Sequence, residues 1–127
     1  GQVLEEDGMV VNNLTVTGTI NGDVVVAYKR YIATISQTGT ADPTVTVLEN
    51  TIGDIVWTRT AFANYAGTLA GAFPDADKTY LIIGNNNDNF FNLSHNTIND
   101  LVILSKDGSN TGQDGLLNNT TIEIRTY

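Results

Sequence analysis

The sequence contains no cysteine. This absence excludes disulfide bonds, zinc sites with thiolate ligands and cysteine nucleophiles. It leaves the compartment open, because a β domain or an oligomer of this length can fold without disulfides. Any reactive or metal-binding chemistry must therefore come from other residue types.

Basic residues are also scarce. Six lysines and arginines stand against fourteen acids, which gives a net charge of -8 over 127 residues. Binding to nucleic acid depends on basic side chains that neutralise phosphates, and binding to an anionic membrane surface depends on similar clusters. No apolar run approaches the roughly 18 residues of a transmembrane helix. We therefore expect neither nucleic acid nor a membrane as a partner.

The chain has no long segment rich in Ala, Leu, Glu and Lys with caps at both ends, so the sequence predicts no clear helix. Short runs of Val, Ile, Thr, Tyr and Phe lie instead between clusters of Gly, Asn, Asp and Pro, which is typical of strands. We predict strands near residues 10–20, 24–37, 44–49, 55–60, 64–73, 78–84, 89–94, 98–105 and 120–127. This spacing predicts an all-β fold, an antiparallel β-sandwich with a jelly-roll-like head of about eight strands.

Segment 24–37 admits two interpretations. Val24, Tyr28, Tyr31 and Ile35 follow helical spacing. The many β-branched residues of the same segment favour a strand, which we prefer.

Alternation assigns the side chains of the later strands to two faces. Ile55 and Trp57 share one face, and so do Ile122 and Ile124, while the residues between them take the other face. Gly67 and Gly71 leave room for a large neighbour. This pattern is typical of antiparallel sheets with one face in solvent.

The first 25 residues have a different pattern. Even positions from Val10 to Ile20 alternate like a strand, and Asn21-Gly22 is a strong hairpin signal. A two-residue hairpin there would mix apolar with charged or polar side chains on both faces, whereas a hairpin on a monomeric core should segregate them. We predict that residues 1–24 form a shaft segment buried against other copies, and that residues 25–127 form the head.

Two parts of the chain resemble bacteriophage tail fibres. Residues 13–22, Asn-Leu-Thr-Val-Thr-Gly-Thr-Ile-Asn-Gly, are similar to the short β-rich connector that precedes the C-terminal domain in many tail fibres and related virion proteins. The remainder is similar to a small terminal domain of phage structural proteins. The residues that carry this second likeness are Tyr31-Ile32-Ala33, Gln37-Thr38-Gly39-Thr40 with Pro43, Val47-Leu48-Glu49-Asn50-Thr51, Trp57-Thr58-Arg59 and Thr121-Ile122-Glu123-Ile124-Arg125-Thr126-Tyr127.

The resemblance implies a position, the distal part of a virion fibre, rather than a chemistry. We expect a non-enzymatic virion structural and binding module that recognises a host-surface glycan or protein. Threefold assembly follows from the same likeness, so the expected partners are a homotrimer, a receptor, and the rest of the fibre through the N-terminus. The alternatives are a glycan depolymerase of tailspike type and a bacterial surface adhesin domain.

Catalytic residues are not predicted. His95 is the only histidine, and no nucleophile-elbow motif accompanies it. Paired carboxylates can hydrolyse glycans, and Glu49 and Glu123 on predicted strands are the acids to consider for this role. Most other acids lie in predicted turns, so we expect no enzyme activity.

Aromatic side chains offer flat faces on which sugars stack. Phe90 and Phe91 are adjacent on a predicted strand, so one of them must meet a neighbouring subunit, a ligand or water. Core packing is the expected role of Trp57 and Tyr65. The candidate ligand-binding residues are Trp57, Phe90, Phe91 and His95.

The asparagine-rich run 85–89 supplies oxygen atoms that would suit calcium. It contains a single charged ligand, and the sequence has no EF-hand spacing. We therefore predict no metal ion and no cofactor.

Overall fold

The computed structural model describes residues 28–85 and 87–127, which form two antiparallel four-stranded sheets. The strands of this part of the chain are β2 (Lys29–Ser36), β3 (Thr44–Asn50), β4 (Val56–Ala61), β5 (Asn64–Thr68), β6 (Thr79–Ile83), β7 (Phe90–Thr97), β8 (Asp100–Lys106) and β9 (Thr120–Thr126). A single turn of 3₁₀ helix, η1 (Ala76–Lys78), precedes β6. The predicted antiparallel sandwich of about eight strands is confirmed.

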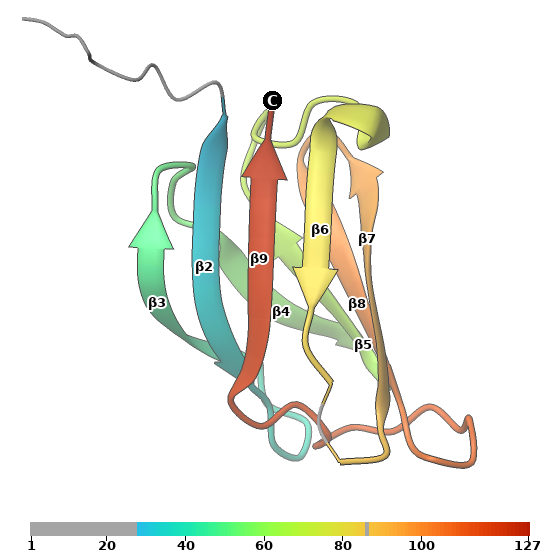
Figure 1. Ribbon diagram of the computed structural model, residues 1–127. Helices are drawn as coiled ribbons and strands as arrows, with labels where there is room; N and C mark the ends of the chain where they lie inside the picture. The colour runs from blue at the N-terminus through green and yellow to red at the C-terminus, as the bar shows by residue number, and fades with distance from the viewer. Residues whose placement is uncertain (1–27, 86) are drawn as a thin grey trace, which may run out of the picture.

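The strand order is β3-β2-β9-β6 in one sheet and β4-β5-β8-β7 in the other. Figure 1 shows the first sheet in front of the second. The pairs β2–β3, β4–β5 and β7–β8 are consecutive antiparallel strands within one sheet.

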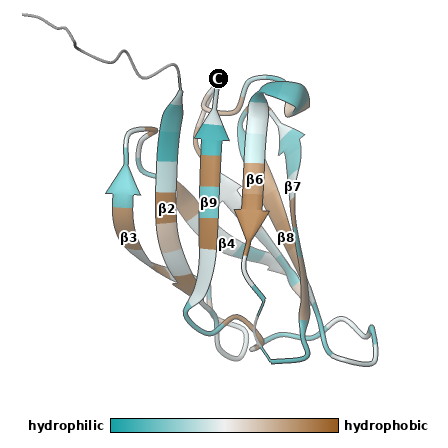
Figure 2. Cartoon of the chain, viewed as in Figure 1, coloured by the Kyte–Doolittle hydropathy of each residue, from teal (hydrophilic) through white to brown (hydrophobic). Residues whose placement is uncertain are grey.

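Alternating side chains fill the space between the sheets. Along β9, Ile122 and Ile124 are buried and Glu123 and Arg125 face outward, and Figure 2 shows this alternation as bands of opposite hydropathy. The one-sided pattern predicted for this strand is confirmed. The largest fully buried hydrophobic side chains are Tyr31, Tyr65, Phe73, Ile35, Leu101, Ile103, Leu117, Ile122 and Ile124.

The Trp57 side chain packs against a glycine. Ile55 and Trp57 are buried and Val56 between them is exposed, as alternation predicts. Trp57 lies directly opposite Gly67 on β5, and a Cβ atom at Gly67 would come within 2.7 Å of the indole ring. The prediction that a glycine makes room for a large neighbour is confirmed at Gly67 and is wrong at Gly71, where a Cβ atom would meet no atom within 4 Å.

The predicted strand over residues 64–73 is wrong beyond Thr68, where β5 ends. The chain turns at Gly71, whose φ of +68° suits glycine far better than other residues. Phe73 is nevertheless buried, and its backbone N–H donates to the carbonyl oxygen of Ile98 at 3.0 Å. Apolar alternation in this segment therefore reflects a loop that folds over the core.

The helical interpretation of segment 24–37 is wrong over β2, which is an extended strand from Lys29 to Ser36. Strands β3, β4, β6, β7, β8 and β9 each begin and end within three residues of the predicted positions. The predicted strand 10–20, its hairpin and the shaft segment 1–24 lie outside the described residues.

The sandwich has two distinct ends. Lys29 at the start of β2 pairs with Thr126 at the end of β9, so residue 28 and the C-terminus lie at the same end, which we call the terminal end (Figure 1). Loops 37–43 and 107–119 lie at the opposite end, which we call the loop end. No helix in the described part of the chain is long and apolar enough to cross a membrane.

Candidate functional site

Two of the four predicted ligand-binding residues belong to the interior. Trp57 is 5% exposed, and its indole N–H donates to the Tyr31 hydroxyl at 3.4 Å. Phe91 is partly buried and packs against the same core. Neither ring presents a broad face to solvent, so both contribute mainly to packing.

Phe90 has the opposite orientation. Adjacent side chains of a strand face opposite sides, and Phe90 is 53% exposed on the outer face of β7. A hollow of about 530 Å³ lies beside its ring. The residues lining this hollow are Phe90, Asn92, Leu104, Lys106 and Asn110. Of the predicted candidates, only Phe90 lines it.

Strand register builds most of this Phe90 hollow. Phe90 lies opposite Lys106, and Asn92 lies opposite Leu104, so all four side chains stand on the outer face of β7 and β8. Asn110 comes from the following loop, where it has a positive φ of 63°. The Asp107 carboxylate accepts hydrogen bonds from the backbone N–H groups at 109 and 111, at 2.9 and 3.0 Å, and thereby shapes this loop.

The chemistry of the Phe90 hollow suits a polar ligand with one apolar face. Phe90 offers a flat ring, and Leu104 extends the apolar surface. Asn92 and Asn110 each bring an amide that both donates and accepts hydrogen bonds, and Lys106 brings a cation. A concave surface with a few convergent polar groups is typical of a small-molecule site.

His95 lies elsewhere, on the inner face of β7. Its Nε2 atom is 2.8 Å from the carbonyl oxygen of Pro74 and 3.2 Å from that of Phe73. Both neighbours are acceptors, so Nε2 carries the proton and donates to them. The imidazole therefore links β7 to the loop before η1, and this nitrogen has no lone pair to offer as a base.

The two acids considered for glycan hydrolysis stand on one sheet face. Glu49 and Glu123 lie on either side of Ile32 in the register, so their strands are roughly 10 Å apart. Glu49 accepts from Arg30 and Glu123 from Arg125, each at 2.6 Å. The hollow beside Glu49 is lined by Tyr28, Lys29, Arg30, Glu49 and Thr51.

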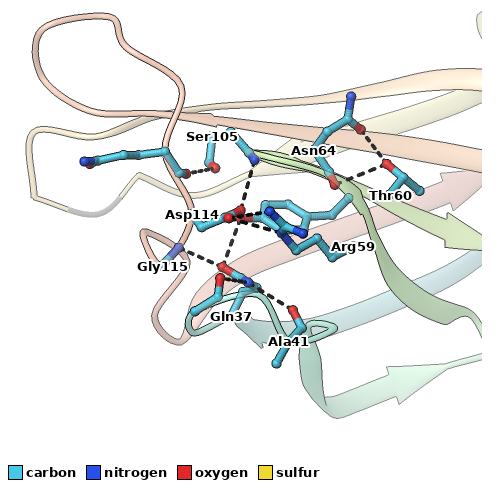
Figure 3. A network of polar contacts seen from close by, with 12 residues as sticks. Gln37, Ala41, Arg59, Thr60, Asn64, Ser105, Asp114 and Gly115 are labelled. Carbon is cyan, nitrogen blue, oxygen red and sulfur yellow. Dashed lines mark hydrogen bonds and ion pairs between the residues drawn. The ribbon is translucent and has the colours of Figure 1, made fainter.

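A buried polar network closes the loop end, and sequence reasoning missed it (Figure 3). Asp114 Oδ2 accepts from Arg59 Nε and Nη2 at 3.1 and 2.8 Å. Asp114 Oδ1 accepts from the backbone N–H of Ala63 at 2.9 Å and from the Tyr65 hydroxyl at 2.8 Å. These contacts join loop 107–119 to β4 and β5.

Gln37 extends the network to the other sheet. Its Oε1 accepts from the Gly115 N–H at 2.7 Å and lies 2.9 Å from the Tyr65 hydroxyl. Its Nε2 donates to the carbonyl oxygens of Gly39 and Ala41 at 2.9 and 3.0 Å. The side chain therefore ties loop 37–43 to loop 107–119.

The pKa values of two groups of the network, Asp114 and Tyr65, are shifted by their surroundings. The Arg59 hydrogen bond lowers the pKa of Asp114 to about 2. Burial raises the pKa of Tyr65 to about 12. These groups are hydrogen-bond partners of one another, so the network holds the loops together rather than offering a reactive group.

Within residues 28–85 and 87–127, no three His, Asp or Glu side chains come close enough together to hold a metal ion. The chain matches no protein-family model, no curated protein and no solved structure.

Proposed function

We propose that this chain is a non-enzymatic virion structural and binding module at the tip of a fibre, and that it recognises a host-surface glycan. The observation that carries this proposal is the Phe90 hollow, in which an exposed ring stands beside two amides and a lysine. Sugars present an apolar ring face and many hydroxyl groups, which these side chains complement.

The position of the hollow supports the same function. Phe90 begins β7 and Lys106 ends β8, both at the loop end (Figure 1). Residue 28, through which the preceding residues join the head, lies at the terminal end. A fibre attached through its N-terminus would therefore present the Phe90 hollow away from the attachment point.

The outer face of the β4-β5-β8-β7 sheet supports the proposed homotrimer. Thr58, Ala66, Val102 and Ser94 follow one another across the four strands, and none of them is charged. Copies of a chain with a net charge of -8 repel one another, so they approach most easily through an uncharged part of a face such as this row, which lies between Asp100 and Lys106 of β8.

The test of glycan recognition is binding of the full chain to an array of cell-surface glycans and to host cells. We expect Phe90→Ala to lower the affinity for the recognised glycan by about tenfold, the equivalent of about 1.4 kcal/mol. Val56→Ala is the matched control, because Val56 is also an exposed apolar residue on the outer face of this sheet but lies away from the hollow. Absence of binding by the natural chain, or equal affinities for the natural chain and Phe90→Ala, would reject the proposal.

A further inference from the structure

The terminal end carries a second surface with unusual chemistry, the tyrosine–arginine cluster of Tyr28, Arg30, Tyr80, Arg125 and Tyr127. In the register of the front sheet, Arg30 lies directly opposite Arg125, and Arg125 lies directly opposite Tyr80. Like charges in directly opposite positions of two strands destabilise a sheet. The arrangement therefore needs compensating contacts.

The compensation comes from carboxylates and from aromatic rings. Glu49 and Glu123 each contact one arginine at 2.6 Å and raise its pKa. The Arg125 guanidinium carbon lies 5.3 Å from the centre of the Tyr28 ring and 5.6 Å from that of Tyr80, which are cation–π distances. These contacts fix the Tyr28 ring in place.

Two hollows of about 400 Å³ each adjoin this cluster, and Tyr28 and Lys29 line both of them. The first also includes Tyr127, whose ring centre is 5.1 Å from that of Tyr28, together with Pro74. Tyr127 is 55% exposed. This first hollow, the Tyr28–Tyr127 hollow, thus combines aromatic surface with a volume that suits a sugar residue.

Lys29 supplies the charge of this hollow. The side chains of Glu49 and Glu123 contact Arg30 and Arg125, whereas Lys29 forms no ion pair with any described residue. An ammonium group beside an aromatic hollow attracts an anion, and it remains available for one because no carboxylate of the described residues is bound to it.

We infer that the Tyr28–Tyr127 hollow binds a carboxylate-bearing sugar residue, of the uronic acid class, with its ring against Tyr127 and its carboxylate on Lys29. Arg30 and Arg125 act as positioning residues, which hold the Tyr28 ring in place. This site is separate from the Phe90 hollow, which lies at the other end of the sandwich, and the inference does not depend on the ligand of that hollow.

The test is calorimetric titration of the full chain with a galacturonic acid trisaccharide and with the corresponding neutral galactose trisaccharide. We expect the acidic probe to bind at least about tenfold more tightly than the neutral one, and its affinity to fall as salt is raised. Lys29→Gln and Tyr127→Ala should each lower the affinity for the acidic probe by about tenfold. Acetate at the same concentration should not displace the acidic probe, because it lacks the ring.

Lys106→Gln is the matched control, since it removes a lysine from the Phe90 hollow instead. Equal binding of both trisaccharides, or no binding of the acidic one, would overturn the inference. A loss of acidic binding with Lys106→Gln or Phe90→Ala but not with Lys29→Gln would also overturn it, while leaving the proposed function at the Phe90 hollow intact. Circular dichroism of each variant separates loss of binding from loss of folding.

Discussion

Trp57 is the only tryptophan of the chain, and its position depends on the glycine opposite to it. The indole ring occupies the space that a side chain at position 67 would fill. Protein interiors are packed as densely as organic crystals, so even one extra methyl group in such a contact is felt.

We expect Gly67→Ala to lower the free energy of unfolding by about 1–3 kcal/mol, because its Cβ would press on the Trp57 ring. The measurement is urea-induced unfolding followed by tryptophan fluorescence. Gly108→Ala is the matched control: its Cβ would lie 3.4 Å from the nearest atom, an ordinary contact, so a change below about 0.5 kcal/mol is expected. Similar effects of the two substitutions would refute this account of the Trp57 contact.

Asp114 makes the stability of the head depend on pH. Its pKa in the folded chain is about 2, below the ordinary value of 3.8, chiefly because of the Arg59 hydrogen bond. The unfolded chain therefore binds a proton at this carboxyl more readily than the folded chain. The stabilising contribution is complete above about pH 4 and is lost as the pH falls towards 2.

We expect the difference in urea midpoint between the natural chain and Asp114→Asn to shrink as the pH falls from 5 to about 2.5. Asp77→Asn, which changes an exposed carboxyl on η1, is the control for the general effect of acid and should show no such trend. A difference that stays constant over this range would mean that the Asp114 charge contributes nothing to stability.

At the scale of strands, the sequence predicted best where alternation is regular. Ile122 and Ile124 are buried and Arg125 faces outward because β9 pairs on both sides, which holds its side chains strictly to the two faces. Ile55 and Trp57 are likewise buried, with the exposed Val56 between them. The physical cause is the period of two in an extended chain, which can be read without knowing the partner strands.

Contacts between distant segments could not be predicted in this way. Tyr65 contacts Gln37 and Asp114, which are 28 and 49 residues away from it in sequence. Arg30 and Arg125 meet only because β2 and β9 pair. Alternation placed Phe90 and Phe91 on opposite faces. The strand register and the loop after β8 bring the amides and the lysine that surround Phe90.

Loop 107–119 is the long connection between β8 and β9, and the Leu117 side chain anchors it to the core. Leu117 is buried, and the backbone carbonyl of the same residue accepts from the Gln37 N–H at 3.0 Å. The Asp114 contacts hold the middle of the loop. Together, the Leu117 side chain and the Asp114 contacts fix the position of the chain where it enters β9.

We expect Leu117→Ala to lower the free energy of unfolding by about 2–4 kcal/mol, because it leaves a cavity at the loop end of the core. Hydrogen exchange should rise most in loop 107–119 and at the start of β9. Leu48→Ala is the matched control, because Leu48 is 64% exposed on β3, and we expect it to cost less than about 0.5 kcal/mol. Equal losses from both would contradict the anchoring role of Leu117.

For the molecule as a whole, the two outer faces differ in kind. The β3-β2-β9-β6 face carries Arg30, Glu49, Glu123 and Arg125 in paired contacts. The middle of the β4-β5-β8-β7 face carries no charge, with Val102 near its centre. Burial of apolar surface without desolvation of charges favours the second face as the contact between copies.

The homotrimer is tested by light scattering coupled to gel filtration, which should report about three times the chain mass of 13.6 kDa. Val102→Lys would place three cations into the proposed contact, and we expect it to raise the concentration at which the trimer dissociates by at least about tenfold. Ile82→Lys, on the charged face beside Glu123, is the matched control and should leave the mass unchanged. A monomer mass for the natural chain would reject the homotrimer. Dissociation by Ile82→Lys alone would instead put the contact on the charged β3-β2-β9-β6 face, and the ion pairs of that face would then join the copies.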